Sequence, residues 1–157
     1  KKQMLMAGVN ILEDEKITIE YAGATMQLLG LNDPNFTTAH DTYEKTAMIN
    51  AKLKNMLGES NKYTILLSHR PELFGLYVEN NIDLVLSGHA HGGQVRLPFF
   101  GGLVAPNQGF FPKYFEGVYE KKQTKMIVSR GLGNSIFPLR VNNRPELVIV
   151  ELWHKSF

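Results

Sequence analysis

The chain contains no cysteine among its 157 residues. Disulfide bridges and metal sites built on thiolates are therefore excluded. No apolar run approaches the roughly 18 residues of a membrane-spanning helix, and no signal-peptide pattern opens the sequence. Lysine and arginine (17) nearly balance aspartate and glutamate (15). The net charge of +2 points to no particular partner, and we expect no nucleic acid to bind.

Apolar residues make up 43% of the chain, which is enough for a buried core. Their periodicity predicts alternating strands and helices. A helix, a strand, a helix and a strand follow one another over 43–88, which implies a parallel strand pair joined by a crossover. The predicted fold class is α/β, with a mixed sheet. Strands are predicted at 16–21, 25–31, 63–67, 83–86, 125–128 and 147–152, and helices at 43–57 and from Pro71 onward.

Three histidines follow two of the predicted buried strands. His69 comes after the strand at 63–67, whereas His89 and His91 come after the strand at 83–86. The C-terminal ends of neighbouring parallel strands share one edge of an α/β sheet, where ligands bind. In extended backbone, residues two apart project to the same side, so His89 and His91 are predicted to point together. Because neutral imidazole is a common metal ligand, the three histidines predict a partial metal site.

Other interpretations of the histidines stay open at this point. A single histidine after a strand is usually a polar loop residue, and only the combination of three favours ligands. His40 and His154 lack such a context and are interpreted as ordinary surface or loop residues. A mononuclear zinc site with three histidine ligands is a further alternative, which metal stoichiometry would decide.

Four stretches of the sequence form an ordered set of motifs: LLSHRPE at 66–72, GHAHGGQ at 88–94, VSRGLGNS at 128–135 and RPELV at 144–148. Together they resemble the C-terminal motifs of the calcineurin-like metallophosphoesterases, most closely a bacterial branch typified by YaeI and YkuE. These stretches follow the family's order and span nearly the whole chain. The resemblance implies the C-terminal half of a four-layer αββα sandwich with mixed sheets. Residues 1–157 would then form a single incomplete domain.

The resemblance also implies a two-metal centre. Two divalent ions (Mn, Zn, Fe or Ni) would be bridged by an aspartate and a water or hydroxide. His69 and His89 would bind one ion and His91 the other. The activated water would hydrolyse a phosphomonoester, a phosphodiester or a pyrophosphate. The substrate is expected to be a phosphorylated small molecule or lipid, and no catalytic residue beyond the metal ligands is expected in this chain.

Two further segments each have two interpretations within the resemblance. Arg130, Gly131 and Asn134 would lie near the substrate, although a purely structural turn is the favoured alternative. The aromatic residues between Gly92 and Tyr119 could line an apolar pocket. Packing of the loop on the protein is the favoured alternative there.

The family's N-terminal motifs DxH, GDxxD and GNH are absent from the sequence, and no Asp-x-His occurs in it. The bridging aspartate and the remaining ligands are therefore missing, and we expect the chain alone to be inactive with at most partial metal occupancy. The alternative is a non-catalytic truncated domain that binds metal weakly or only assembles. Unpaired strands predict association with the missing N-terminal half or with a second copy. Members of this branch are often membrane-anchored or exported, and the chain leaves its localisation open.

Overall fold

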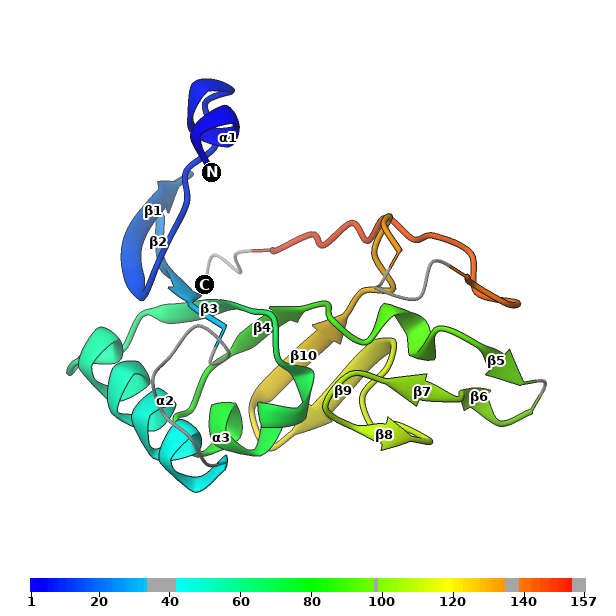
Figure 1. Cartoon of the computed structure of the whole chain (residues 1–157). Coiled ribbons are helices and arrows are strands. Elements are labelled where there is room, and N and C mark those ends of the chain that lie inside the picture. Colours follow the sequence, from blue (N-terminus) through cyan, green and yellow to red (C-terminus); the bar gives the residue numbers. More distant parts are fainter. Residues whose placement is uncertain (34–41, 98, 135–138, 154–157) are drawn as a thin grey trace.

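The computed structural model of the chain describes residues 1–33, 42–97, 99–134 and 139–153 (Figure 1). Among these residues the main element is a six-stranded sheet with the order β1-β2-β3-β4-β10-β9. The four central strands are parallel, and β1 and β9 are each antiparallel to their neighbour. The predicted α/β class with a mixed sheet is confirmed. The strands are β1 (Glu15–Tyr21), β2 (Ala24–Leu31), β3 (Tyr63–Ser68), β4 (Leu84–Ser87), β9 (Gly117–Lys121) and β10 (Thr124–Val128).

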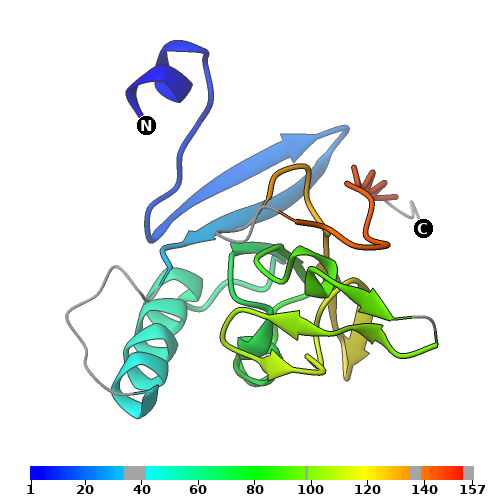
Figure 2. The same cartoon turned by 45° about the vertical axis from the view of Figure 1, so that its right-hand side comes forward.

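Two helices pack on one face of the sheet (Figures 1 and 2). In α2, Ile49, Leu53 and Met56 recur at helical spacing and are buried, as an amphipathic helix requires. A 3₁₀ turn opens at Pro71 and leads into α3, which matches the predicted helix start. None of the helices in the described part of the chain has the length and apolar character that a bilayer crossing requires. The helical elements are α1 (Lys2–Met6), α2 (Thr42–Leu57), η2 (Pro71–Leu73), α3 (Phe74–Glu79) and η3 (His91–Gly93).

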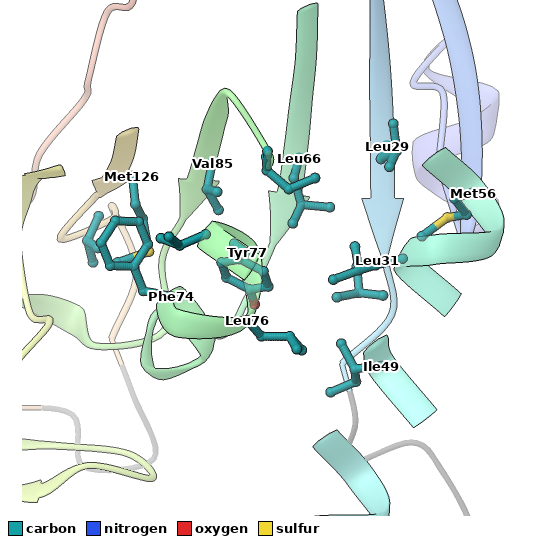
Figure 3. Close-up of a cluster of buried hydrophobic side chains, with 14 of the residues drawn as sticks. Leu29, Leu31, Ile49, Met56, Leu66, Phe74, Leu76, Tyr77, Val85 and Met126 are labelled. Atoms are coloured by element: carbon teal, nitrogen blue, oxygen red, sulfur yellow. The ribbon is translucent and has the colours of Figure 1, made fainter. Parts of the chain in front are cut away.

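The core is a row of side chains that crosses the four parallel strands. Leu29, Leu66, Val85 and Met126 are aligned in register on adjacent strands, and all four are 0% exposed. Tyr77 from α3, also fully buried, packs over this row (Figure 3). The row fixes the relative positions of the strands whose C-terminal ends carry the candidate ligands.

The predicted strand at 147–152 is wrong. These described residues form no strand, and the segment passes over the sheet without joining it (Figure 1). Alternation of polar and apolar residues produces a strand only where a neighbour offers a hydrogen-bonding edge. Leu147 and Ile149 are 78% and 81% exposed, and Leu147 and Val150 line a cavity of about 310 Å³ with Leu86 of β4. The four-layer arrangement stays a prediction.

An arm of two short hairpins extends from the C-terminal edge of the sheet (Figures 1 and 2). We define the arm as residues 95–116, of which residue 98 lies outside the described part. Gly93 and Gly102 make close backbone contact at its base. The strands of the arm are β5 (Arg96–Leu97), β6 (Gly101–Gly102), β7 (Val104–Ala105) and β8 (Gly109–Phe110).

Alanine in place of Gly93 is expected to lower the free energy of unfolding by about 1–3 kcal/mol. Its Cβ would lie 2.3 Å from the Cα of Gly102, and the φ of Gly93 is +75°, which disfavours a side chain. Gly75 is the matched control, because it lies exposed in α3 and a Cβ added there would meet no atom within 4 Å. Urea unfolding followed by circular dichroism measures the free energy of unfolding of both variants. Equal unfolding midpoints for the two variants would contradict the expectation.

Candidate metal centre

His69 and His89 meet at the C-terminal edge of the sheet. His69 directly follows β3, and His89 lies two residues beyond the end of β4. Since β3 and β4 are adjacent and parallel, their ends bring the two rings together. Nδ1 of His89 lies 2.9 Å from Nε2 of His69, and the ring centroids are 4.5 Å apart. His69 also lines a cavity of about 310 Å³ at this edge. Two of the three predicted ligands therefore share one site.

His91 lies close to this pair on a turn of the backbone. The backbone is not extended here, because φ is +67° at His89 and +47° at His91, and a 3₁₀ turn begins at His91. The prediction of an extended backbone from His89 to His91 is thus wrong, and a common direction of the two rings stays a prediction. Burial, Arg140 and the charge of His69 lower the pKa of His91, whereas a hydrogen bond to the Gly133 carbonyl raises it. A metal-binding role for His91 stays a prediction.

Hydrogen-bond donors surround Nε2 of His89. The Asn107 amide nitrogen lies 2.6 Å away, and Nη1 of Arg70 lies 3.5 Å away. Both groups donate, so Nε2 must accept, and the proton of the neutral ring is on Nδ1, which donates to His69. Burial, His69 and Arg70 lower the pKa of His89 to about 4. His89 is therefore neutral near pH 7, which is the form that binds metal ions.

Arg70 links the site to the end of β2. Its side chain is only 4% exposed. Its guanidinium donates to Asp33 at 2.8–3.1 Å and to Glu72 at 3.1 Å. The Tyr77 hydroxyl donates to the Arg70 carbonyl at 2.8 Å and shares a 2.7 Å hydrogen bond with Ser68, and burial raises the pKa of Tyr77. These bonds fix the backbone on both sides of His69.

Sequence reasoning missed Asp33 and Asn107 as neighbours of the histidines. Asp33 lies just beyond β2, so the rule that selected His69 could also have found it. Asn107 lies in the turn between β7 and β8, and no sequence pattern marks its contact with His89, 18 residues away. Its φ of +58° is a conformation that asparagine tolerates better than most residues.

The glycine-rich loop after β10 forms a hydrogen-bonded turn. The Arg130 backbone N–H and guanidinium both donate to Glu146, at 3.1 and 3.2 Å. Gly131 has a φ of +68°, and its carbonyl accepts from the Glu146 N–H at 3.1 Å. The Asn134 side chain is exposed. Contact of Arg130, Gly131 and Asn134 with a substrate stays a prediction.

The histidine pair fits part of a metal shell. Two nitrogen ligands at about 2.1 Å from one ion lie about 3 Å apart when they subtend a right angle, and the observed separation is 2.9 Å. Binding of an ion through Nδ1 of His89 would require the ring proton to move to Nε2, where the Asn107 side chain could accept it after its amide turned over. Among the described residues, however, no group of three or more histidine, aspartate or glutamate side chains is placed to hold a metal ion. The described part of the chain thus brings two candidate ligands into contact and does not complete a metal shell.

Comparison with known proteins finds several relatives that are named metallophosphoesterases and one that is named a phosphodiesterase. The uncharacterized metallophosphoesterase YkuE of Bacillus subtilis is 32% identical over 97% of this chain and 49% of its own length. The phosphodiesterase YaeI of Escherichia coli is 35% identical over 60% of this chain and 34% of its own length. An uncharacterized metallophosphoesterase of Campylobacter jejuni is 44% identical over 68% of this chain and 27% of its own length.

No family model and no solved structure matches the chain. The chain spans about half the length of YkuE, and less of the other two relatives. The match to YkuE nevertheless includes nearly every residue described above, among them the three histidines. The resemblance predicted from the motifs is confirmed, and the chain belongs to the metallophosphoesterases, in the branch that includes YkuE and YaeI.

Proposed function

We propose that the chain supplies His69 and His89 to one divalent ion, and His91 to a second, in the two-metal centre of a phosphoester hydrolase. The remaining ligands would come from a part equivalent to the half of YkuE that this chain does not match. The observation that carries the proposal is the 2.9 Å approach of two imidazoles at the C-terminal edge of a parallel sheet. The family names of the relatives support the same chemistry.

Within this site, the residues of the chain hold and orient the ligands. Asn107 contacts Nε2 of His89 and Arg70 lies near it, which orients the ring with Nδ1 facing His69, and Nδ1 would bind the ion once the ring proton had moved to Nε2. Tyr77 and Ser68 hold the backbone that carries His69. Bound ions would lower the pKa of a water molecule and neutralise charge on the phosphoryl oxygens. Nitrogen ligands suit Mn, Zn, Fe or Ni, and carboxylates from elsewhere would decide among them.

The substrate of this hydrolase would be a phosphomonoester, a phosphodiester or a pyrophosphate, carried by a small molecule or a lipid. One relative is named a phosphodiesterase, which makes a phosphodiester the first substrate to test. Arg130, Gly131 and Asn134 would approach the substrate from the loop after β10. This loop lies next to His91, because the backbone of Gly133 forms a hydrogen bond with the His91 ring.

A second candidate function is a non-catalytic domain that only assembles with a partner. The observation that favours it is the apolar segment at 147–153, in which Leu147, Ile149 and Trp153 are 78–86% exposed. Unpaired backbone with exposed apolar side chains is a surface that another chain can cover. Either a part equivalent to the unmatched half of YkuE or a second copy of this chain would fit that surface.

Metal removal distinguishes the two functions. We expect the full-length gene product that contains this chain to hydrolyse bis(p-nitrophenyl) phosphate with Mn²⁺, to lose that activity in EDTA, and to regain it on addition of Mn²⁺. The 157-residue chain alone is expected to stay near background. Hydrolysis that survives EDTA, or none with Mn²⁺, Zn²⁺, Fe²⁺ or Ni²⁺, would reject the hydrolase and favour the assembly domain.

A further inference from the structure

The arm carries four phenylalanine side chains that are mostly exposed in the described structure. In the turn between β5 and β6, Phe99 and Phe100 are 104% and 73% exposed. At the end of β8, Phe110 and Phe111 are 74% and 62% exposed. Tyr114, Phe115 and Tyr119, in contrast, pack against the core. The expectation that the aromatic residues pack the loop is therefore met by these three and not by the four phenylalanines.

The backbone of the arm holds two of these rings outward at a conformational cost. Phe99 has a φ of +69° and Phe111 a φ of +54°. A bulky residue in this region of φ is an outlier, and such outliers cluster at functional sites. Glycine or asparagine would adopt the same turns with less strain. Because Phe99 is fully exposed and Phe111 is 62% exposed, these rings contribute little to packing among the described residues and are available for contact with another surface.

The charge of the arm indicates which kind of surface the exposed phenylalanines would contact. The sequence of the arm contains two basic residues, Arg96 and Lys113, and one acidic residue, Glu116. Arg96 pairs with Glu116, while Lys113 lies 5.1 Å from the centre of the Tyr114 ring. Exposed aromatic rings beside a basic side chain, with no nearby acidic residue on the same turns, match the interface of an anionic bilayer.

We propose that the arm docks the chain on an anionic phospholipid bilayer, with the four phenylalanines inserted at the level of the headgroups. The arm is joined to the candidate site at its other end, since Asn107 in the turn between β7 and β8 lies 2.6 Å from His89. Docking through Phe110 and Phe111 would therefore bring the histidine edge of the sheet near the bilayer surface. The proposal rests on the arm alone and does not require the hydrolase function.

Co-sedimentation with vesicles tests the proposal. The probe is a 3:1 mixture of phosphatidylcholine and phosphatidylglycerol, compared with pure phosphatidylcholine. A variant with serine at all four positions (F99S, F100S, F110S and F111S) is expected to lose at least about tenfold in partitioning. The matched control, L147S with I149S, removes equally exposed apolar side chains outside the arm and is expected to bind like the wild type. Binding to pure phosphatidylcholine is expected to be weaker by at least about threefold.

Several results would overturn the proposal. The wild type could fail to sediment with anionic vesicles, or it could bind neutral and anionic vesicles equally. The L147S/I149S control could also lose as much vesicle binding as the four-serine variant. Self-association of the wild type without vesicles, abolished by the four serines, would assign the surface to a protein partner instead. Circular dichroism shows whether each variant keeps its fold. Since H89A is expected to bind vesicles like the wild type, failure of docking and failure of the hydrolase are separate outcomes.

Discussion

Replacing Arg70 with alanine is expected to lower the free energy of unfolding by about 3–5 kcal/mol. The side chains of Asp33 and Glu72, which are 12% and 21% exposed, would lose their shared guanidinium partner. Removing one member of a buried ion pair leaves the other charge partly desolvated, which costs more than the pair itself stabilises. Urea unfolding followed by circular dichroism measures the loss.

The matched control for Arg70 is Lys125→Ala. Lys125 pairs with Glu120 at 3.3 Å, but both side chains are 59% exposed, so solvent screens the pair. Its removal is expected to cost about 0–1 kcal/mol. A double variant, R70M with D33N, is expected to recover part of the stability that R70M alone loses, because it removes one of the two stranded charges. If R70A and K125A shift the midpoint equally, Arg70 is not the buried link that the structure describes.

Alanine at His69 or at His89 is expected to reduce kcat/KM of the full-length protein by at least about 100-fold in the Mn²⁺-dependent assay. Each ring would be one of the nitrogen ligands of a single ion, and the 2.9 Å separation of the two nitrogens is the basis for placing them on the same one. The double variant is therefore expected to lose no more activity than either single variant, since the ion is already lost.

Metal analysis of the purified variants adds a second measurement. Each single variant should retain about one ion fewer per chain than the wild type, as should the double variant. K125A serves again as the control and is expected to keep both activity and metal content. Additive losses in the double variant would mean that the two rings act on different ions, and undiminished activity would mean that neither is a ligand.

Local patterns predicted most of the sheet. The apolar runs of β3 and β4 lie within one residue of their predicted bounds, because a strand buried on both faces is recognisable from its own residues. The segment at 147–152 has an equally good alternating pattern but no neighbouring strand to pair with. The existence of a pairing edge is a property of the whole fold, and the sequence pattern does not contain it.

The candidate site was predictable only in part, for the same reason. The meeting of His69 and His89 followed from the strand order that the crossover implied. The backbone turn at His91 did not follow, although Gly92 and Gly93 beside it indicated a turn rather than a strand. Asp33 could have been selected by its place after β2, but its contact with Arg70, 37 positions away, has no local signal, and neither has the contact of Asn107 with His89, 18 positions away.

The register of β2, β3 and β4 has a consequence for how this region assembles as the chain folds. Asp33, Arg70 and His89 belong to three successive strand ends, so their contacts close only after two crossover connections have formed. Contacts of this kind are distant in the chain and are among the last to be made, because the entropy of closing each loop must be overcome first. An early folding intermediate that contains only the hairpin of β1 and β2 would hold none of them, so the imidazole pair reports on completion of the parallel core.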